Sequence, residues 1–445
     1  MSTTGLLFLG IFFGCMALAI TRHPIYGLVM YVLVFYLHPP SRWWGEDLPD
    51  LRWAFLAAAV TAVAVFRLPP NPARPSWFAN PAARILIAYV AWVWLQTFWA
   101  LDRESHVFLG VLLTKFLVVF FLIYRIVDSS ERITTILLAH VAGCLYLAWL
   151  AQSTEYTGRL NGVGGPGIDD ANSLSMQLAT GVMAAAMLLF QEKGWRRWFC
   201  VLAAPVLLNA MVMTGSRGGF LGLAAGGLVL WYLRPAFNRR LFYTLAGLGV
   251  VGFLAVASGS FWERMSTIKV AARGASEEVE ESALSRWKIM EFQVQMAREH
   301  PMGVGHRGTV VLSTEYLDPR WLSRQGGRSS HNTFLTAWGE QGIPGAVIYF
   351  SFWGWIGLTA LRARRAARVA SVPQLQSQLP ALVGGLAVVM ASGMFTDYVR
   401  AEIQIWLVAL LTVLYGLASG RQDAAVQARS KLIGPTEMGQ SRPPS

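Results

Sequence analysis

One short stretch late in the chain combines residue types that suit group-transfer chemistry. His331 and Asn332 stand just before an apolar segment, and a Gly-Ile-Pro-Gly sequence begins at Gly342 after nine intervening residues. A neutral imidazole at the end of a membrane helix is suited to accept a proton from a hydroxyl that reacts beside a lipid-bound substrate. We therefore predict that His331 acts as a general base or as an activating contact.

The residues around this histidine have expected structural roles. Asn332 is expected to orient His331 or to cap the helix that follows, and the polar run Ser-His-Asn-Thr leaves open that the histidine itself serves only as a cap. Gly342 and Gly345 are expected to allow close packing or a bend around Pro344.

Three arginines are candidates to bind a phosphate-containing substrate. Arg217 stands in a Ser-Arg-Gly-Gly sequence before a helix start that offers free N–H groups, Arg286 lies in a long polar segment, and Arg159 lies in a glycine-rich loop. Guanidinium groups bind phosphate oxygens in pairs and stay charged at low dielectric constant, so they can stabilise a leaving pyrophosphate. The alternatives are that Arg217 extends to lipid headgroups and that Arg286 pairs with nearby glutamates.

Other titratable residues rank lower. His306, in a Gly-Val-Gly-His-Arg-Gly sequence, is a further candidate to line the site, and Asp397 is a weaker candidate to orient the acceptor or the base. Asp169 and Asp170 favour a helix N-cap over a metal-binding pair. No cysteine and histidine spacing typical of a metal site occurs, so we predict metal-independent chemistry without a cofactor.

The composition places these residues in a polytopic membrane protein. The 445-residue chain is 54% hydrophobic and 14% charged, with a mean hydropathy of +0.44, whereas a soluble protein carries about 25% charged residues. Much of the net charge of +12 lies in short loops between apolar segments, which indicates membrane orientation and disfavours nucleic acid as a partner. The three cysteines lie in or beside apolar segments and offer no disulfide framework.

Apolar segments recur along the whole chain, and lipid offers them no hydrogen-bond partners, so we expect helices. Their cores are 5–20, 24–38, 53–66, 85–100, 107–123, 133–152, 172–190, 198–213, 218–233, 241–257, 343–360, 380–395 and 402–418. The first two are short. Two full spans there would give thirteen helices, whereas a half-inserted or broken pair would give twelve, which we favour.

Arginine-rich loops predict the orientation and the domain organisation. The loop at 362–368 carries four arginines and no acid, which marks it as cytoplasmic and places 258–342 on the periplasmic side. We therefore divide the chain into a first part of the helix bundle (1–257), a large periplasmic loop with the catalytic motif (258–342), C-terminal transmembrane helices (343–418) and a disordered cytoplasmic tail (419–445).

Within the large loop, residues 277–300 are expected to form an amphipathic helix that Pro301 ends. Its apolar members are Trp287, Ile289, Met290, Phe292 and Val294.

Four features together resemble the O-antigen ligases. They are His-Asn followed after nine residues by Gly-x-x-Gly (331–345), Ser-Arg-Gly-Gly (216–219), Arg-Trp followed by His-Pro-Met-Gly-Val-Gly (286–305), and one large loop late in a chain of about twelve helices. The resemblance implies an all-α, glycosyltransferase C-like membrane fold. It also implies transfer of a glycan from undecaprenyl pyrophosphate to the lipid A–core sugar of lipopolysaccharide, on the periplasmic face of the bacterial inner membrane.

With this resemblance, the residues take expected roles. The expected catalytic residues are His331, Arg217 and Arg286, and the expected substrate-binding residues are Arg159, Asn332, His306, Gly342 and Gly345. The expected partners are the lipid-linked donor, the lipid A–core acceptor and membrane lipids. Inversion at the anomeric carbon is expected, because no carboxylate is well placed as a covalent nucleophile.

Other activities remain open at this stage. An O-antigen polymerase or a protein O-oligosaccharyltransferase of the same superfamily would carry similar short motifs. A transporter or flippase is disfavoured, because the spans do not carry charged residues at matched positions in two halves.

Overall fold

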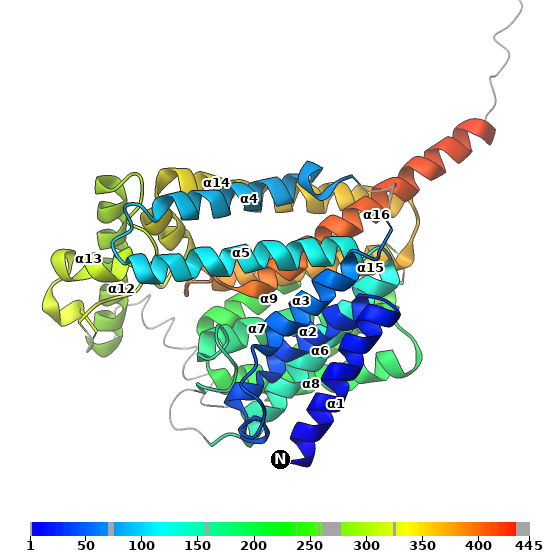
Figure 1. Ribbon diagram of the computed structural model, residues 1–445, viewed down its shortest axis with the longest axis horizontal. Helices are drawn as coiled ribbons and strands as arrows, with labels where there is room; N and C mark the ends of the chain where they lie inside the picture. Colours follow the sequence, from blue (N-terminus) through cyan, green and yellow to red (C-terminus); the bar gives the residue numbers. More distant parts are fainter. Residues whose placement is uncertain are drawn as a thin grey trace, which may run out of the picture.

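In the part of the chain that it describes, the computed structural model contains helices joined by loops and no β-strand. It describes residues 2–69, 75–155, 160–236, 238–256, 259, 277–323 and 326–432, with side chains except at 253, 256, 277–286 and 422–432. Fifteen α-helices and no strand occur among these residues (Figure 1). They are α1 (Thr3–Thr21), α2 (Ile25–Leu37), α3 (Trp53–Val65), α4 (Pro81–Gln96), α5 (Arg103–Ile126), α6 (Ser130–Ser153), α7 (Ala171–Gln191), α8 (Gly194–Thr214), α9 (Arg217–Leu233), α10 (Arg239–Val256), α12 (Glu277–Glu299), α13 (Gly308–Tyr316), α14 (Thr333–Val369), α15 (Pro373–Ser392) and α16 (Glu402–Leu432).

Eight of the described helices are long and apolar enough to cross a membrane, which confirms the predicted membrane protein. They are α1, α5, α6, α7, α8, α14, α15 and α16, while α2, α3, α4 and α9 are apolar but shorter. The first apolar pair forms two separate helices, and α2 has 13 residues, about 20 Å at the rise of an α-helix, against a hydrocarbon core of about 30 Å. The total of twelve spans stays a prediction.

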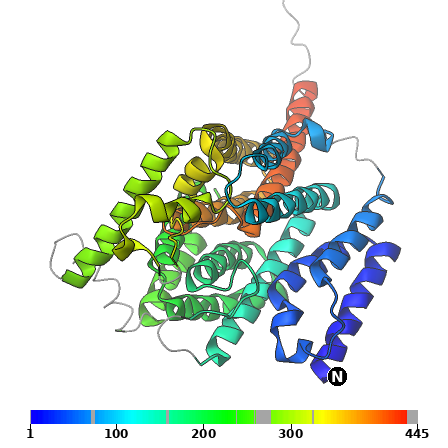
Figure 2. The same ribbon diagram turned by 60° about the vertical axis from the view of Figure 1, so that its left-hand side comes forward.

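Close helix packing surrounds α7, which is almost wholly buried. Helices α8, α9 and α15 pack against it, and α9 also packs along α15 (Figures 1 and 2). Glycines permit this approach, because a Cβ at Gly219 would lie 2.0 Å from Ser175 Oγ of α7 and one at Gly222 would lie 2.1 Å from Ser392 Oγ of α15. Small residues at helix contacts are typical of membrane proteins, where packing drives association.

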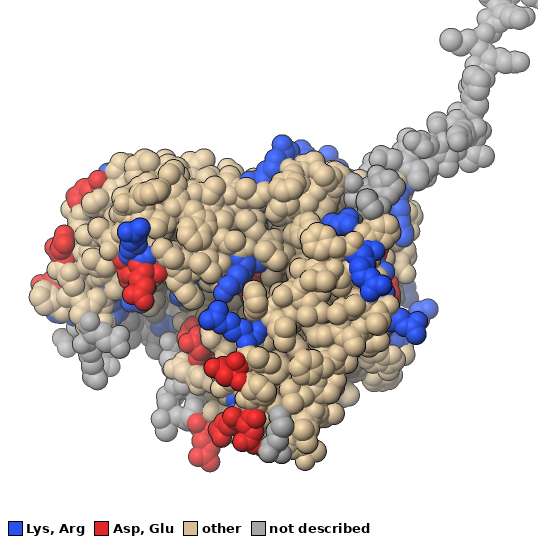
Figure 3. Space-filling view, viewed as in Figure 1, with Lys and Arg blue, Asp and Glu red and all other residues tan. Residues whose placement is uncertain are grey.

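Charge divides the two ends of the bundle. On the face seen in Figure 3, several Lys and Arg side chains gather at the right-hand end, around α15, while acidic side chains lie at the left-hand end with α12 and α13 and along the lower edge. Helix α14 connects these ends, since it begins beside α13 and finishes in the arginine-rich segment 362–368. The positive end is the one that the sequence predicts to be cytoplasmic.

Helix α14 is interrupted at Gly342, whose backbone is not helical (φ 68°, ψ −175°). Pro344 has no N–H, so the carbonyl of Glu340 lacks its helical partner. That carbonyl accepts instead from Gly305 N at 2.9 Å and from Gln96 Nε2 at 2.8 Å. The expected bend around Pro344 is therefore present. The carbonyl that the bend leaves without a helical partner is hydrogen-bonded by other segments of the chain.

The segment before α13 fits into this interruption. Ile343 N donates to Pro301 O at 2.8 Å, and Trp92 Nε1 donates to Gln341 O at 2.8 Å. A Cβ at Gly342 would lie 2.3 Å from the Met302 carbonyl carbon. Glycine is needed here both for the backbone angles and for the contact.

The amphipathic helix predicted at 277–300 is α12, and it ends before Pro301. Its Ile289 and Phe292 are buried in a small core with residues of α13, whereas Trp287 is 64% exposed and Met290 is 41% exposed. The five predicted apolar members therefore do not form one buried face. Helix α16 continues to Leu432, so residues 419–432 are helical where composition predicted disorder, and the remainder of that tail lies outside the described residues.

The interruption generates a stability prediction. Replacement Gly342→Ala should lower the free energy of unfolding by about 3 kcal/mol, because its φ and ψ values are accessible almost only to glycine and the new Cβ would overlap Met302. Thermal unfolding of the detergent-purified protein measures this change. Gly354→Ala in the same helix is the matched control, since its Cβ would meet no atom within 4 Å. Equal melting temperatures for the two variants would contradict the proposed constraint.

Candidate functional site

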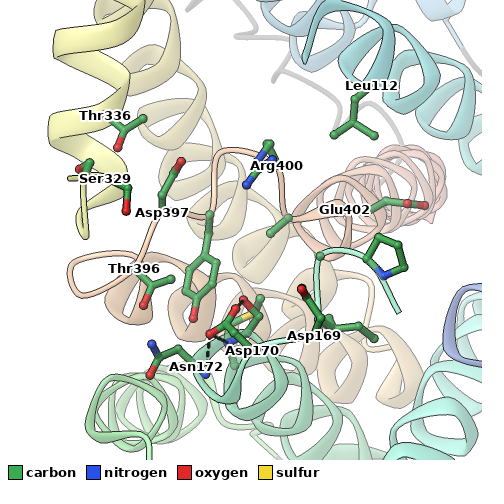
Figure 4. Close-up of a pocket in the computed structure, with 18 of the residues that line it drawn as sticks. Leu112, Asp169, Asp170, Asn172, Ser329, Thr336, Thr396, Asp397, Arg400 and Glu402 are labelled. Carbon is green, nitrogen blue, oxygen red and sulfur yellow. Dashed lines mark hydrogen bonds between the residues drawn. The ribbon is translucent and has the colours of Figure 1, made fainter. Parts of the chain in front are cut away.

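A cavity of about 760 Å³ lies where the N-terminal ends of α7, α14 and α16 meet. One side is apolar and comes mainly from α5, with Phe108, Leu112 and Phe116. The other side is polar and charged (Figure 4). Its charged and titratable members are Asp169, Asp170, His306, Arg307, His331, Glu340, Asp397, Arg400 and Glu402. An amphipathic ligand with a charged headgroup and an apolar chain would match these two sides.

His331 lies on the cavity wall one residue before the cap of α14, and its side chain is exposed. Asn332 provides the cap, because its Oδ1 accepts from Phe334 N at 2.9 Å and from Leu335 N at 3.1 Å. Asn332 Nδ2 also donates to Met394 O at 3.3 Å. The capping role that the sequence left open for the histidine therefore belongs to Asn332, and this cap fixes the backbone next to His331.

The start of α14 also holds the loop between α15 and α16. Thr333 N donates to Gly393 O at 2.7 Å, and Thr333 Oγ1 donates to Thr396 O at 2.8 Å. Tyr398 N donates back to Thr333 Oγ1 at 2.8 Å. These bonds bring Asp397, which the loop carries, to the cavity beside the first turn of α14 (Figure 4).

A buried acid–base pair connects two motifs that are distant in sequence. His306 Nδ1 lies 3.0 Å from Glu340 Oε2, and both side chains are buried at the cavity edge. His106 of α5 holds this segment, since its Nδ1 accepts from His306 N at 2.8 Å while its Nε2 lies 2.7 Å from Val93 O. With Nδ1 as an acceptor, the His106 proton must reside on Nε2, directed at that carbonyl.

Asp397 has a perturbed acidity in this arrangement. Burial raises the pKa of its carboxyl to about 6, and the nearby negative charge of Glu340 adds to the rise. The Val399 N–H, which donates to Asp397 Oδ1 at 3.0 Å, and the positive charge of Arg400 act in the opposite direction. Asp397 therefore exchanges a proton near pH 6, which is useful in a site that handles hydroxyl groups.

Two arginines that line the cavity were not singled out from the sequence. Arg307 directly follows His306 with a left-handed backbone (φ 62°), and Arg400 stands in the α15–α16 loop. Both side chains are exposed at the cavity. The sequence held a clue to both arginines, because each stands close to a titratable residue that had been singled out. Arg307 follows His306, and Arg400 is the first arginine after Asp397.

The predicted arginines have different outcomes. Arg217 is the first residue of α9 and is not among the described residues that line the cavity, although the preceding Ser216 donates to Asn172 Oδ1 of the wall at 2.9 Å. Arg159 lies outside the described residues. Arg286 belongs to α12, but its side chain is not described.

The predicted glycines belong to the interruption of α14. A Cβ at Gly345 would lie 2.4 Å from Gln341 Cβ and 2.9 Å from Trp92 Nε1, so this glycine allows close packing as expected. Neither Gly345 nor Gly342 is among the described cavity-lining residues.

The aspartates before α7 form the expected helix cap. Asp170 Oδ1 accepts from Asn172 N at 2.8 Å and from Ser173 N at 3.2 Å, and Ser173 Oγ donates to its other oxygen. Asp169 lines the cavity with an exposed side chain. Within the described residues, no group of three or more His, Cys, Asp and Glu side chains is placed to share a metal ion.

The helices and the cavity define a multi-pass membrane protein with a charged site at one end of its bundle. Residues 202–350 match the family model described as O-antigen ligase. The matched segment runs from α8 into α14 and includes Arg217, His306 and His331. The resemblance seen in the motifs is thereby confirmed. A search of curated proteins finds no match.

The acidity of Asp397 generates a pH prediction. A carboxyl with a folded-state pKa of about 6, above the ordinary value of 3.8, binds more protons in the folded state than in the unfolded state between these pH values. Stability therefore falls as pH rises through this window, by about 1–3 kcal/mol. In Asp397→Asn this loss should disappear, so the melting temperature of the variant relative to the unmodified protein should rise from pH 4 to pH 6 and then level off.

The control for this measurement is Asp318→Asn, which removes a carboxylate outside the cavity that forms an exposed ion pair with Arg320, and so reports the effect of a lost surface carboxylate. A temperature difference for Asp397→Asn that does not change with pH would show that its carboxyl is not perturbed.

Proposed function

We propose that this protein is an O-antigen ligase, which transfers a glycan from undecaprenyl pyrophosphate to the lipid A–core sugar of lipopolysaccharide. The match to the O-antigen ligase family model supports this reaction class. The observation that supports the proposal is the cavity at one end of the bundle, whose lining includes His331, Arg307, Arg400 and an apolar wall. We propose that this end faces the periplasm and that the protein resides in the inner membrane, because the opposite end carries the arginine-rich loops.

The donor requires cations for its pyrophosphate and apolar surface for its lipid. Arg307 and Arg400 line the cavity and are suited to bind phosphate oxygens, together with the predicted contribution of Arg217 from the start of α9. Arg159 and Arg286 stay candidates for the same task on sequence grounds. The aromatic and aliphatic side chains of α5 offer a surface to the isoprene units next to the pyrophosphate.

The acceptor requires a group that removes a proton. We propose that a hydroxyl oxygen of the acceptor sugar attacks the anomeric carbon of the donor while its proton passes to His331. The new carbon–oxygen bond forms as the bond to pyrophosphate breaks, and the electron pair leaves with undecaprenyl pyrophosphate. Guanidinium groups near the pyrophosphate stabilise the charge that develops on this leaving group. A single displacement of this kind inverts the anomeric configuration and needs no metal, because the pyrophosphate is already an activated leaving group.

The direct test is a transfer assay with the purified protein and an undecaprenyl pyrophosphate-linked glycan. Three acceptors are offered separately: lipid A–core, a second lipid-linked glycan and a pilin-like peptide. We expect product only with lipid A–core, and NMR of that product should show an inverted anomeric linkage. Transfer to the second lipid-linked glycan alone would identify a polymerase, transfer to the peptide alone a protein ligase, and a retained configuration would exclude single displacement.

His331 has a separate prediction in this assay. His331→Ala should lower the turnover number by about 100- to 10,000-fold, because a positioned general base contributes rate factors of that order. His300→Ala is the matched control, since His300 directly follows α12 and is not among the described cavity-lining residues. Gel filtration and circular dichroism establish that each variant is folded. If folded His331→Ala and folded Arg217→Ala both retain full transfer, the assigned site is wrong.

A further inference from the structure

A cluster of arginines lies at the end of the bundle opposite the cavity. Arg234 follows α9, Arg239 begins α10, and Arg364 and Arg368 stand in the last turns of α14. We call these four residues the arginine cluster. Helices α9 and α14 separate it from the cavity by their whole lengths, because the cavity wall contacts the first residues of both. The cluster therefore plays no part in the proposed transfer site.

Hydrogen bonds hold the segments of the arginine cluster together. Arg364 Nη2 donates to Tyr232 O at 2.8 Å, and its guanidinium lies over the Tyr232 ring at 4.4 Å from the ring centre. Gln376 of α15 joins the same segments, since its Nε2 donates to Ala367 O at 3.3 Å and its Oε1 accepts from Ala236 N at 3.4 Å. The ends of α9, α14 and α15 thus form a connected surface.

The arginine cluster has uncompensated positive charge. Arg368 experiences electrostatic repulsion from Arg364, Arg234 and Arg239. Within the described part of the chain, no ion pair joins any of the four to a carboxylate. The sequence explains this, because residues 217–256 and 341–396 contain no aspartate or glutamate. Like charges that the fold brings together without acids favour a bound anion.

One N–H donor in the arginine cluster is shielded from water and has no hydrogen-bond acceptor within the described residues. The Nε of Arg364 is buried and makes no hydrogen bond within the described residues, although the other side of the same guanidinium bonds to Tyr232. A buried N–H without an acceptor has lost its hydrogen bonds to water without a replacement, which is unfavourable. A phosphate oxygen accepts from guanidinium groups in pairs and would satisfy this donor.

The level of the cluster in the bundle indicates where the anion comes from. Trp231 and Tyr232, directly before the cluster, are 51% and 56% exposed, and Leu228 one turn earlier is 72% exposed. Exposed aromatic residues at the end of an apolar helix are typical of the depth of lipid headgroups. A phosphate at that depth belongs to a phospholipid.

We propose that the arginine cluster binds the headgroup of an anionic phospholipid, and that a headgroup with two phosphates, of the cardiolipin class, fits best. Four guanidinium groups can give two to each phosphate, whereas a headgroup with one phosphate leaves part of the repulsion uncompensated. Basic surfaces between helix ends are suited to such headgroups. The proposal is independent of the proposed transfer reaction, since it concerns the other end of the protein.

The test uses the full-length protein in detergent with added tetraoleoyl cardiolipin, dioleoyl phosphatidylglycerol or dioleoyl phosphatidylcholine. Native mass spectrometry measures the lipid bound to the folded protein. We expect the tightest binding for cardiolipin. Each arginine near an anionic headgroup contributes about 1 kcal/mol, so Arg364→Gln/Arg368→Gln should weaken cardiolipin binding by about 30-fold. If this double variant does not fold, Arg368→Gln alone should weaken binding by about 5-fold.

The matched control is Arg67→Gln/Arg125→Gln, which removes the same charge near the ends of α3 and α5. It should bind cardiolipin as the unmodified protein does. The proposal is overturned by an equal loss in this control, since attraction would then be diffuse, or by equal binding of phosphatidylcholine and cardiolipin. Displacement of bound lipid by millimolar inorganic phosphate would also overturn it, because the site would then select a free anion.

Discussion

A membrane helix that is interrupted leaves backbone groups that lipid cannot satisfy, so other parts of the protein must satisfy them. In α14 the interruption at Gly342 is accommodated by the segment 301–305 and by side chains at the end of α4. Pro344 has no N–H to donate to the carbonyl of Glu340. That carbonyl accepts instead from Gly305 N and from Gln96 Nε2. This docking fixes the position of the segment, together with the bonds from Trp99 Nε1 to Gly303 O and from Leu101 N to Val304 O.

The cavity depends on that docking. The segment 301–305 leads directly into His306, and the interrupted helix carries Glu340, so the bonds that satisfy the backbone also bring this acid and base together. Burial raises the pKa of Asp397 in the α15–α16 loop, and the negative charge of Glu340 adds to that rise. A change at the interruption would therefore alter charged groups of the site that lie on three different segments.

Local patterns in the sequence predicted the individual helices well, but they did not predict which residues from different helices and loops come together. Long apolar segments predicted the helices because lipid leaves the backbone no other partner, and the polar run before α14 predicted its cap at Asn332. Arg307 and Arg400 stand close to residues that the sequence did single out, but the sequence could not show that both line one cavity, because they are about 90 residues apart. Residues 419–432 were misjudged because polar composition alone does not show that a preceding span can continue its helix.

The two ends of the bundle are connected by the same helices. Helix α9 begins with Arg217 near the cavity wall and leads into Arg234 of the arginine cluster, and α14 runs from the capped turn after His331 to Arg368. Because glycine contacts pack α9 closely against α7 and α15, a shift of α9 along its axis would disturb the wall at Asn172. A lipid that fixes the arginine cluster at headgroup depth would therefore also fix the depth of the cavity, and with it the level at which the proposed lipid-linked donor would meet His331.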